Sequence, residues 1–301
     1  MTVQTDVTYV LDRGFVQPTV ISAFSLLTHR PANITLRFLL TEDAPALAAA
    51  TTRLQHLFPG ASIECRVEPA LDHGMTTRGH VSAATLARLM LPRLVEQPTL
   101  YLDGDTLVCR DIAAAFATPL LGLPIAACRD PGIQKALHHR DHGGFASRKS
   151  QQHLRDMGKI GHLVDVPNYF NAGVILFDLP RIRAEGFDSQ MQDIAAAVAL
   201  RETYKLRFND QNWLNHVFKG RVAPMDPAWN AFWGNRMTNR APFPPDARAA
   251  YAPSRADPGL VHFTGRTKPW LVRHPWAYPK RWPWIFRYKA VQRACEAAMA
   301  G

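Results

Sequence analysis

The segment Tyr101-Leu-Asp-Gly-Asp-Thr-Leu-Val108 places Asp103 and Asp105 at the end of a short apolar run that we expect to form a β-strand. Two carboxylates one residue apart can share one hard divalent cation, particularly where Gly104 permits a turn that brings both inward. Open α/β sheets bind ligands at the carboxyl ends of their strands, which favours a metal site here. A polar hairpin turn is the alternative interpretation, since Asp-Gly is a common turn pair.

The pattern around this segment predicts an α/β fold with a mostly parallel central sheet flanked by helices. We expect strands near residues 7–11, 34–41, 62–67, 99–101, 107–109, 125–128, 173–177 and 260–263. We expect helices near residues 18–28, 44–58, 82–96, 182–201 and 211–218. Residues 130–167, rich in Gly, His, Arg and Lys, are expected to form a mobile loop over a site, and residues 224–258 to be mainly loop.

The composition is that of an ordinary globular protein: 301 residues, 47% hydrophobic and 20% charged. The four cysteines show no Cys-x-x-Cys spacing, so neither a zinc ribbon nor a disulfide framework is indicated, and a reducing compartment fits best. We expect no signal peptide and no membrane-spanning segment, because no apolar run approaches the ~20 residues that a spanning helix needs. The net charge of +10 favours polyanionic partners.

A second polar segment, Leu260-Val-His-Phe-Thr-Gly-Arg-Thr-Lys-Pro-Trp270, carries His262 in an apolar strand and Lys268 after a glycine. An imidazole and two carboxylates leave positions open on Mn²⁺ or Mg²⁺ for phosphate oxygens, and a lysine can neutralise the same phosphates. The alternatives are a hydrogen-bonded core histidine and a solvated turn lysine.

Two further polar groups lie at the starts of expected elements. Asn171, Ala172 and Gly173 open a strongly apolar strand, where small residues let a ligand approach the backbone and the Asn171 amide can bind hydroxyl groups. A bulge at the start of a core strand is the alternative. The cluster Asn209-Asp-Gln-Asn212 begins a helix, for which Asp210 as a simple N-cap is the alternative.

Together these four segments resemble family 8 of the retaining glycosyltransferases, which includes bacterial lipopolysaccharide galactosyl- and glucosyltransferases and glycogenin. The matching motifs are Tyr-Leu-Asp-x-Asp, Phe-Asn-Ala-Gly-Val, Asp-Gln before a helix, and His-Phe-x-Gly-x-x-Lys-Pro-Trp, in the family's order, from about Val7 to Trp270. The resemblance implies a GT-A type catalytic domain in residues 1–270. It also implies retaining transfer of a hexose, galactose or glucose, from a UDP-sugar to a saccharide or glycolipid acceptor, in lipopolysaccharide or another surface glycan.

The resemblance also implies roles for individual residues. The metal, Mn²⁺ or alternatively Mg²⁺, would be held by Asp103, Asp105 and His262. Catalysis would involve Asp210, Gln211 and Lys268. Donor binding would involve Asp12, His80, Arg88, Asp103, Asn171, Ala172, Asp210, Gln211, Gly265 and Lys268. Two departures from the family pattern are Gly14, where a polar side chain often contacts the nucleotide, and Asn212, which replaces a frequent second acid.

The basic aromatic tail, residues 271–301, is expected to be a separate appendage. Eight Lys or Arg and no acid lie between Arg266 and Arg293, interleaved with tryptophan and tyrosine. A helical cap packed on the core is one interpretation and nucleic-acid binding is another. We favour an anionic membrane surface, to which both side-chain types are attracted, and expect no nucleic-acid partner. The expected location is cytoplasmic, at the inner face of the membrane.

Two rival functions stay open at this point. A sugar nucleotidyltransferase also builds a metal site on an α/β sheet, but it needs a Gly-rich basic loop after the first strand. Leu11-Asp-Arg-Gly-Phe15 is too short and too poor in glycine for that loop. A noncatalytic basic protein that binds nucleic acid or membranes is the other rival, and its metal residues would be dispensable.

Overall fold

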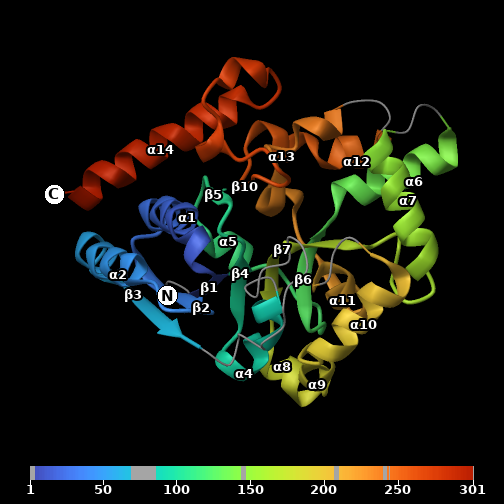
Figure 1. The fold of residues 1–301 in the computed structure, drawn as a ribbon, viewed down its shortest axis with the longest axis horizontal. Helices are drawn as coiled ribbons and strands as arrows, with labels where there is room; N and C mark the ends of the chain where they lie inside the picture. The colour runs from blue at the N-terminus through green and yellow to red at the C-terminus, as the bar shows by residue number, and fades with distance from the viewer. Residues whose placement is uncertain are drawn as a thin grey trace.

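The computed structural model describes residues 4–68, 86–143, 147–206, 210–239, 243 and 245–300. A seven-stranded sheet with the order β3-β2-β1-β4-β7-β6-β8 forms its centre (Figure 1). Its strands are β1 Thr5–Leu11, β2 Ala32–Leu40, β3 Gly60–Val67, β4 Thr99–Leu102, β6 Ile125–Arg129, β7 Phe170–Phe177 and β8 Val222–Pro224. Four of the six strand pairings are parallel, and β7 runs antiparallel to both of its neighbours. The mostly parallel sheet predicted from the sequence is confirmed.

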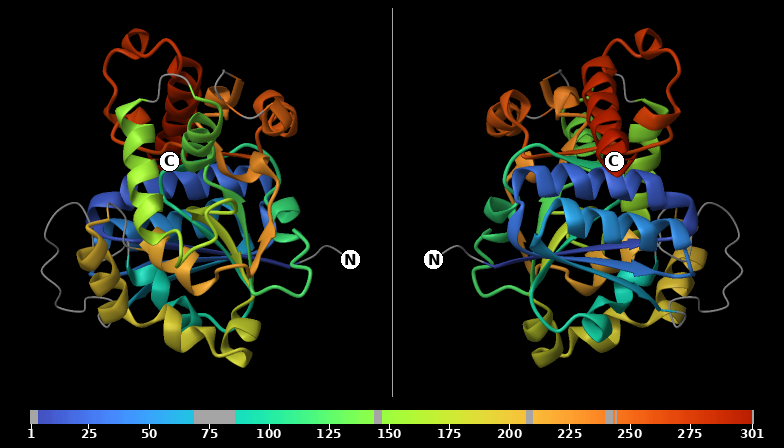
Figure 2. Two further views of the ribbon diagram at one scale, coloured as in Figure 1. Left: turned by 90° about the vertical axis from the view of Figure 1, so that its right-hand side faces the viewer. Right: turned by 90° about the vertical axis from the view of Figure 1, so that its left-hand side faces the viewer.

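Helices cover both faces of this sheet (Figure 2). One face carries α1 (Val16–His29), α2 (Pro45–Leu57) and α14 (Trp282–Ala300). The other carries α4 (Leu91–Leu94), α8 (Leu179–Ala184), α9 (Phe187–Met191), α10 (Ile194–Tyr204) and α11 (Asp210–Val217). Neighbouring residues of β4 divide between the two cores: Leu100 and Leu102 pack on the α1 face and Tyr101 on the α11 face. A strand buried on both faces reads as a continuous apolar run, as this one does.

A smaller sheet joins β5 (Thr106–Val108), β10 (Leu260–His262) and β9 (Ala231–Phe232) in the order β5-β10-β9. Because β4 and β5 belong to different sheets, Asp103-Gly104-Asp105 is a link between the two sheets, and the hairpin-turn interpretation is wrong. A Cβ on Gly104 would lie 2.2 Å from Thr19 Oγ1 and 3.1 Å from Phe15 Cδ1. The glycine is therefore required by close packing against the start of α1.

The prediction of a loop over residues 130–167 is wrong, because the segment contains α6 (Pro131–His142) and α7 (Arg148–Ile160). The Asp130 carboxylate caps α6 by accepting from the backbone N–H groups of Gly132 and Ile133, at 2.8 and 3.2 Å. In α7 the buried side chains include His153, Met157 and Ile160, spaced to share one helix face. The polar composition that suggested a loop belongs to the outer faces of two amphipathic helices.

Three other expected elements differ in their boundaries. Residues 182–201 form parts of α8, α9 and α10, with breaks where Gly186 takes a positive φ of 77° and where Asp193 caps α10. In the described part of the segment 82–96, a 3-10 turn (Arg88–Met90) precedes α4, which ends before Val95. The region 224–258 holds more structure than the predicted loop: Pro227–Asn230, Arg236–Asn239, α12 (Pro245–Ala250) and α13 (Ala252–Ala256) are helical.

The tail packs α14 across α1 and α2 (Figure 1). Trp284, Ile285, Tyr288 and Cys295 are buried in the same core as the α1 side chains. The Tyr288 ring lies 5.4 Å from that of Phe263, next to His262. For this side of α14 the helical-cap interpretation is confirmed. Within the described residues, no helix combines the length and apolar character needed to cross a bilayer.

Candidate functional site

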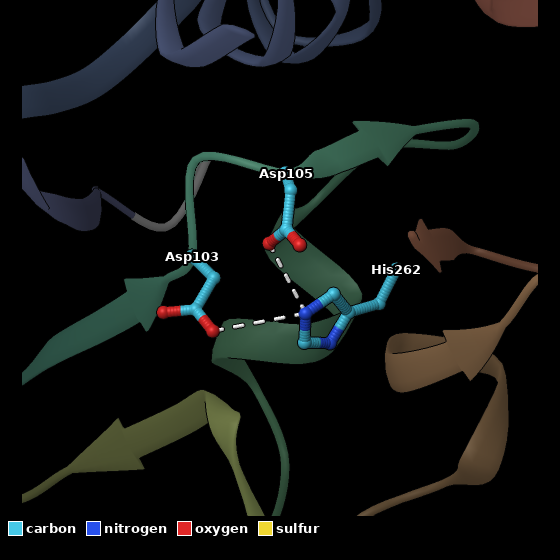
Figure 3. Close-up of side chains that lie close together, drawn as sticks. All are labelled: Asp103, Asp105 and His262. Carbon is cyan, nitrogen blue, oxygen red and sulfur yellow. Dashed lines mark ion pairs between the residues drawn. The ribbon is translucent and has the colours of Figure 1, made fainter. Parts of the chain in front are cut away.

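Asp103, Asp105 and His262 converge where the two sheets meet (Figure 3). His262 Nε2 lies 3.2 Å from Asp105 Oδ1 and 3.7 Å from Asp103 Oδ2. One ligand atom from each residue lies within 4.8 Å of the other two. Asp105 and His262 are buried, whereas the Asp103 side chain is 24% exposed, which leaves the cluster open to a ligand. Two carboxylate oxygens and one imidazole nitrogen suit a divalent cation such as Mn²⁺ or Mg²⁺.

Backbone hydrogen bonds hold the three residues in place. The Asp103 N–H donates to the Gly173 carbonyl at 2.8 Å, which extends the pairing of β4 with β7 by one residue. The Phe263 N–H donates to the Asp105 carbonyl at 2.9 Å and so ties the end of β10 to the start of β5. The site therefore depends on the contact between the sheets, which no single stretch of sequence contains.

A buried arginine links the cluster to α11. Arg88 lies 2.9 Å from Asp103 Oδ1 and 3.3 Å from Asp210 Oδ2, and its Nη1 donates to the Ala172 carbonyl at 2.8 Å. Burial by itself lowers the pKa of Arg88, but the negative charges of Asp103 and Asp210 outweigh it and raise that pKa. The guanidinium is therefore a fixed positive charge beside the carboxylates. Tyr101 adds a hydrogen bond from its hydroxyl to Asp103 Oδ1 at 2.7 Å.

A second cation closes the other side of the cluster. The Lys268 ammonium is paired with Asp105 Oδ2 and also donates to the Phe263 carbonyl at 2.9 Å. Burial alone raises the pKa of Asp105, but attraction to His262 in its protonated form and to Lys268 holds that pKa well below its usual value. Gly265, at a positive φ of 88°, lies in the turn between β10 and Lys268 and is exposed. Asp105 is thus an ionised carboxylate at neutral pH.

Behind the cluster runs a series of buried amides. His262 Nδ1 lies 2.9 Å from Asn230 Oδ1, and Asn230 Nδ2 donates to Asn171 Oδ1 at 2.9 Å. Asn171 Nδ2 donates to Gln211 Oε1 at 2.9 Å, and Gln211 Nε2 donates to Asp130 Oδ2 at 3.2 Å. Neither Asn230 nor Asp130 was predicted from the sequence. Asp followed directly by Pro is a helix N-cap pattern that could have drawn attention to Asp130.

The strand β7 reaches the site through a bulge. Ala127 of β6 pairs with Ile175 of β7, and Arg129 pairs with Phe170. The paired residues are therefore two positions apart in β6 but five positions apart in β7. The bulge interpretation of this segment is confirmed, and the bulge also brings Gly173 against the cluster. A Cβ on Gly173 would lie 2.2 Å from His262 Cε1 and 2.7 Å from Asp103 Oδ2.

The structure therefore gathers most of the predicted site residues at one place. Asp12 follows β1 at the carboxyl edge shared with Asp103, because β1 and β4 are parallel neighbours, and it is half-buried. Asp210 begins α11, and burial raises its pKa although Arg88 opposes that effect. His80 lies outside the described residues. The residues joined by direct contacts are Arg88, Asp103, Asp105, Asn171, Ala172, Asp210, Gln211, His262 and Lys268.

Comparison with known proteins gives a consistent result. General stress protein A of Bacillus subtilis is 24% identical over 203 residues, which cover 65% of this chain and 63% of that protein. Lipopolysaccharide 1,2-glucosyltransferase of Escherichia coli is 26% identical over 200 residues, which cover 65% of this chain and 49% of that protein. The chain thus spans between about half and two-thirds of the length of these relatives.

Solved structures show the same architecture. The crystal structure of the galactosyltransferase LgtC in complex with donor and acceptor sugar analogues matches with a TM-score of 0.72 at 22% identity, covering 96% of each chain. This likeness identifies the fold as that of the GT-A glycosyltransferases. The sequence model described as Glycosyl transferase family 8 matches residues 6–273, which include both carboxylates of the cluster and its histidine. By this match over most of its length, the chain belongs to glycosyl transferase family 8.

Proposed function

We propose that this chain transfers a hexose, galactose or glucose, from a UDP-sugar to a saccharide or glycolipid acceptor of a surface glycan such as lipopolysaccharide, with retention at the anomeric carbon. The observation that carries this proposal is the convergence of Asp103, Asp105 and His262 beside Lys268 and Arg88. This arrangement supplies the ligands of a divalent cation together with two fixed positive charges. A nucleoside diphosphate is a substrate that such a site can bind through its phosphates.

Mn²⁺, or Mg²⁺ in its place, would be held by Asp103, Asp105 and His262. When bound, the ion would neutralise the donor diphosphate and favour departure of the nucleotide. Lys268 lies against Asp105 and is 19% exposed, so its ammonium would add positive charge beside the departing phosphate. Arg88 holds the Asp103 and Asp210 carboxylates on either side of its guanidinium and fixes their separation.

Donor recognition would come from the remaining polar groups at the site. Asp210, Gln211 and Asn171 would bind the hydroxyls of the sugar, and Asp12 would face the uridine from the carboxyl end of β1. Ala172 lets the ligand approach the backbone, and Gly265 permits the turn that leads to Lys268. Asp12, Gly265 and the undescribed His80 stay predictions from the family pattern.

The proposed route to retention is front-face attack by the acceptor. Gln211 is a neutral amide, and its Oε1 already accepts from Asn171 Nδ2 and from the Ala172 N–H at 2.9 and 3.3 Å. An oxygen so engaged is a poor nucleophile for a covalent intermediate. In the front-face step the bond from sugar to phosphate breaks, the acceptor oxygen bonds the anomeric carbon on the same face, and the departing phosphate oxygen takes the acceptor's proton.

Incubation with radiolabelled UDP-galactose and UDP-glucose, with Mn²⁺ or with EDTA, tests the proposal. We expect Mn²⁺-dependent release of UDP, and transfer once a saccharide acceptor is present, with an α-linked product from an α-linked donor. Release of pyrophosphate from UTP and a sugar phosphate would instead show a nucleotidyltransferase. Absence of any nucleotide release with both donors would favour a noncatalytic role.

Replacing Asp210 with asparagine is expected to lower kcat by about 10²-fold and to change the KM for the donor much less. The reason is that hydroxyl contacts from a carboxylate strengthen as charge develops on the sugar. Burial raises the pKa of Asp210, so its ionised form costs stability at neutral pH, but asparagine also removes one of the two carboxylates paired with the buried Arg88, and the melting temperature is expected to fall. Steady-state kinetics and thermal melting give the two measurements.

The control for this variant is Asp188→Asn, which changes another aspartate in the first turn of a helix, α9, that contributes no residue to the site. Its kinetics should equal those of wild type. If Asp210→Asn raises only the KM and keeps kcat, the residue contributes to ordinary donor binding and its proposed catalytic role is wrong.

We also propose that the tail attaches the enzyme reversibly to the anionic inner face of a membrane. Trp276, Trp282 and Phe286 form an exposed cluster, with the Phe286 ring centroid 5.2 and 5.8 Å from those of Trp276 and Trp282. Exposed cations of the tail, including Arg273, Lys280, Arg287 and Arg293, supply charge of the required sign. Aromatic rings in the headgroup region and cations on anionic lipid together suit peripheral binding.

The triple variant Trp276→Ser, Trp282→Ser, Phe286→Ser is expected to bind vesicles of phosphatidylcholine and phosphatidylglycerol at least about tenfold more weakly. These side chains are exposed, so the fold should persist, whereas truncation at Pro279 would remove the buried Trp284 and Tyr288 and should unfold the protein. Co-sedimentation gives the measurement, and salt should weaken wild-type binding because exposed charges are screened within ~8 Å.

Leu121→Ser is the matched control, because Leu121 is 74% exposed but lies in the turn before β6. It should bind the vesicles as wild type does. Vesicle binding by the triple variant as strong as that of wild type would exclude the aromatic cluster as the attachment site.

A further inference from the structure

We infer that Asp130, from the N-terminus of α6, positions His262 for metal binding by fixing which of its ring nitrogens carries the proton. The inference rests on the metal role proposed above for His262. Asp130 is not one of the clustered metal ligands and contacts none of them directly among the described hydrogen bonds. It acts through three amide side chains that lie between it and the imidazole.

The hydrogen bonds of this series all run in one direction. Starting at the imidazole, His262 Nδ1 meets Asn230 Oδ1, Asn230 Nδ2 meets Asn171 Oδ1, Asn171 Nδ2 meets Gln211 Oε1, and Gln211 Nε2 meets Asp130 Oδ2. The four distances are 2.9, 2.9, 2.9 and 3.2 Å. The five residues are between 2% and 9% exposed, so water does not readily replace a broken link.

Two backbone groups determine how the amides face. The Gly173 N–H donates to Asn171 Oδ1 at 3.1 Å, and the Ala172 N–H donates to Gln211 Oε1 at 3.3 Å. A backbone N–H can only donate, so it must meet an amide oxygen and not an amide NH₂. Turning either side-chain amide over would place two donors against each other in a buried site. The bulge of β7 therefore sets the direction in which the amides donate.

Asp130 fixes the far end of the series. One of its oxygens accepts from the Gly132 and Ile133 N–H groups at the start of α6, and the other accepts from Gln211 Nε2. A carboxylate is purely an acceptor, so it requires the NH₂ of Gln211 on its side. This requirement reinforces the one set by the backbone of β7.

The consequence appears at the imidazole. Since the Asn230 NH₂ is committed to Asn171, only its oxygen faces His262, and Nδ1 must carry a proton that it donates. Nε2 then has its lone pair available at the point where Asp103 and Asp105 converge, as a metal ligand requires. Without these hydrogen bonds, a neutral imidazole could carry its proton on either Nδ1 or Nε2.

The first test is Asp130→Asn. The asparagine oxygen can still cap α6, but its NH₂ would face the NH₂ of Gln211 and oppose the direction of the series. Titration of the protein with Mn²⁺ in the presence of UDP, followed by the electron paramagnetic resonance of free Mn²⁺, should show a 10- to 100-fold weaker affinity. Asp193→Asn, which makes the same change at the N-cap of α10, should bind Mn²⁺ as wild type does.

A rescue experiment separates positioning from a structural role. Adding Asn230→Asp to Asp130→Asn moves the carboxylate to the other end of the series, where it accepts directly from His262 Nδ1. At least part of the lost Mn²⁺ affinity should return if Asp130 acts through the series. If Asp130→Asn acts by damaging α6, the second substitution cannot restore the affinity. Failure of this rescue in a folded double variant would overturn the positioning role of Asp130.

The tautomer of His262 can be measured in the wild-type protein itself. Nitrogen NMR of ¹⁵N-histidine protein with UDP and Mg²⁺, which has no unpaired electrons, should show protonated Nδ1, with the signal assigned by its loss in His262→Asn. Protonation at Nε2, or wild-type Mn²⁺ affinity in Asp130→Asn, would refute the inference. If Asp103→Asn also bound Mn²⁺ normally, the proposed metal site itself would be wrong.

Discussion

Asp105→Asn is expected to lower transfer at least about 10³-fold while the fold stays intact. Asp105 is buried and contributes one of the two carboxylates of the cluster, so its neutral isostere would weaken binding of the cation that is proposed to neutralise the donor diphosphate. A loss of about 4 kcal/mol of transition-state stabilisation corresponds to this factor. Asp103→Asn should act in the same way and also leave Arg88 with one carboxylate fewer.

The measurements are UDP release with Mn²⁺ and the circular dichroism of each variant. Asp257→Asn serves as control, because Asp257 is exposed and paired with Arg110 at the surface. Near wild-type turnover in both cluster variants would show that the assigned metal site is wrong.

The pH profile of the wild type gives an independent check on the charge of Asp105. Its pKa in the folded protein is lowered, so its pairing with Lys268 stabilises the fold above the unfolded pKa of about 4. That contribution is lost only as the pH falls through the lowered value. Moderately acidic buffer should therefore not reproduce the Asp105→Asn defect through protonation of this carboxyl.

The cluster of Asp103, Asp105 and His262 could be predicted because each of its members is marked by its own neighbours in the sequence. Asp103 and Asp105 follow an apolar strand, and His262 ends another, so the edge of a sheet was a reasonable place to expect all three. The sequence could not show that β4 and β5 enter different sheets. A turn at Gly104 and Asp105 carries the chain from one sheet to the other and brings the two carboxylates together.

Asn230 could not be predicted for a different reason. It lies in a Pro- and Asn-rich stretch without periodicity, and its partners Asn171 and His262 are 59 and 32 residues away. Its role arises from contacts between the bulged β7 and the end of β10. Asp130 was easier to predict, because the Asp-Pro pair at the start of α6 is a local N-cap signal. The many charged residues of that helix instead suggested a loop.

Gly173→Ala is expected to weaken Mn²⁺ binding and transfer at least about 100-fold, although it replaces none of the proposed ligands. The added Cβ would lie 2.2 Å from His262 Cε1 and 2.7 Å from Asp103 Oδ2, distances at which one of the ligands or the strand must move. Displacing a catalytic group by about 1 Å can cost this much rate. The strain of overpacking should also lower the free energy of unfolding by about 1–3 kcal/mol.

Gly158→Ala is the matched control, because Gly158 is exposed in α7 and its added Cβ would have no atom within 4 Å. That variant should keep wild-type activity and gain up to about 1 kcal/mol of stability from the helix propensity of alanine.

Gly173 does not have a positive φ, so alanine meets no backbone obstacle there and its effect must come from the Cβ itself. Wild-type Mn²⁺ affinity in Gly173→Ala would mean that His262 and Asp103 are not held against β7 as described. Loss of affinity, with all three ligands still present, would show that the site requires the separation set by the bare backbone of β7 as well as the right donor atoms.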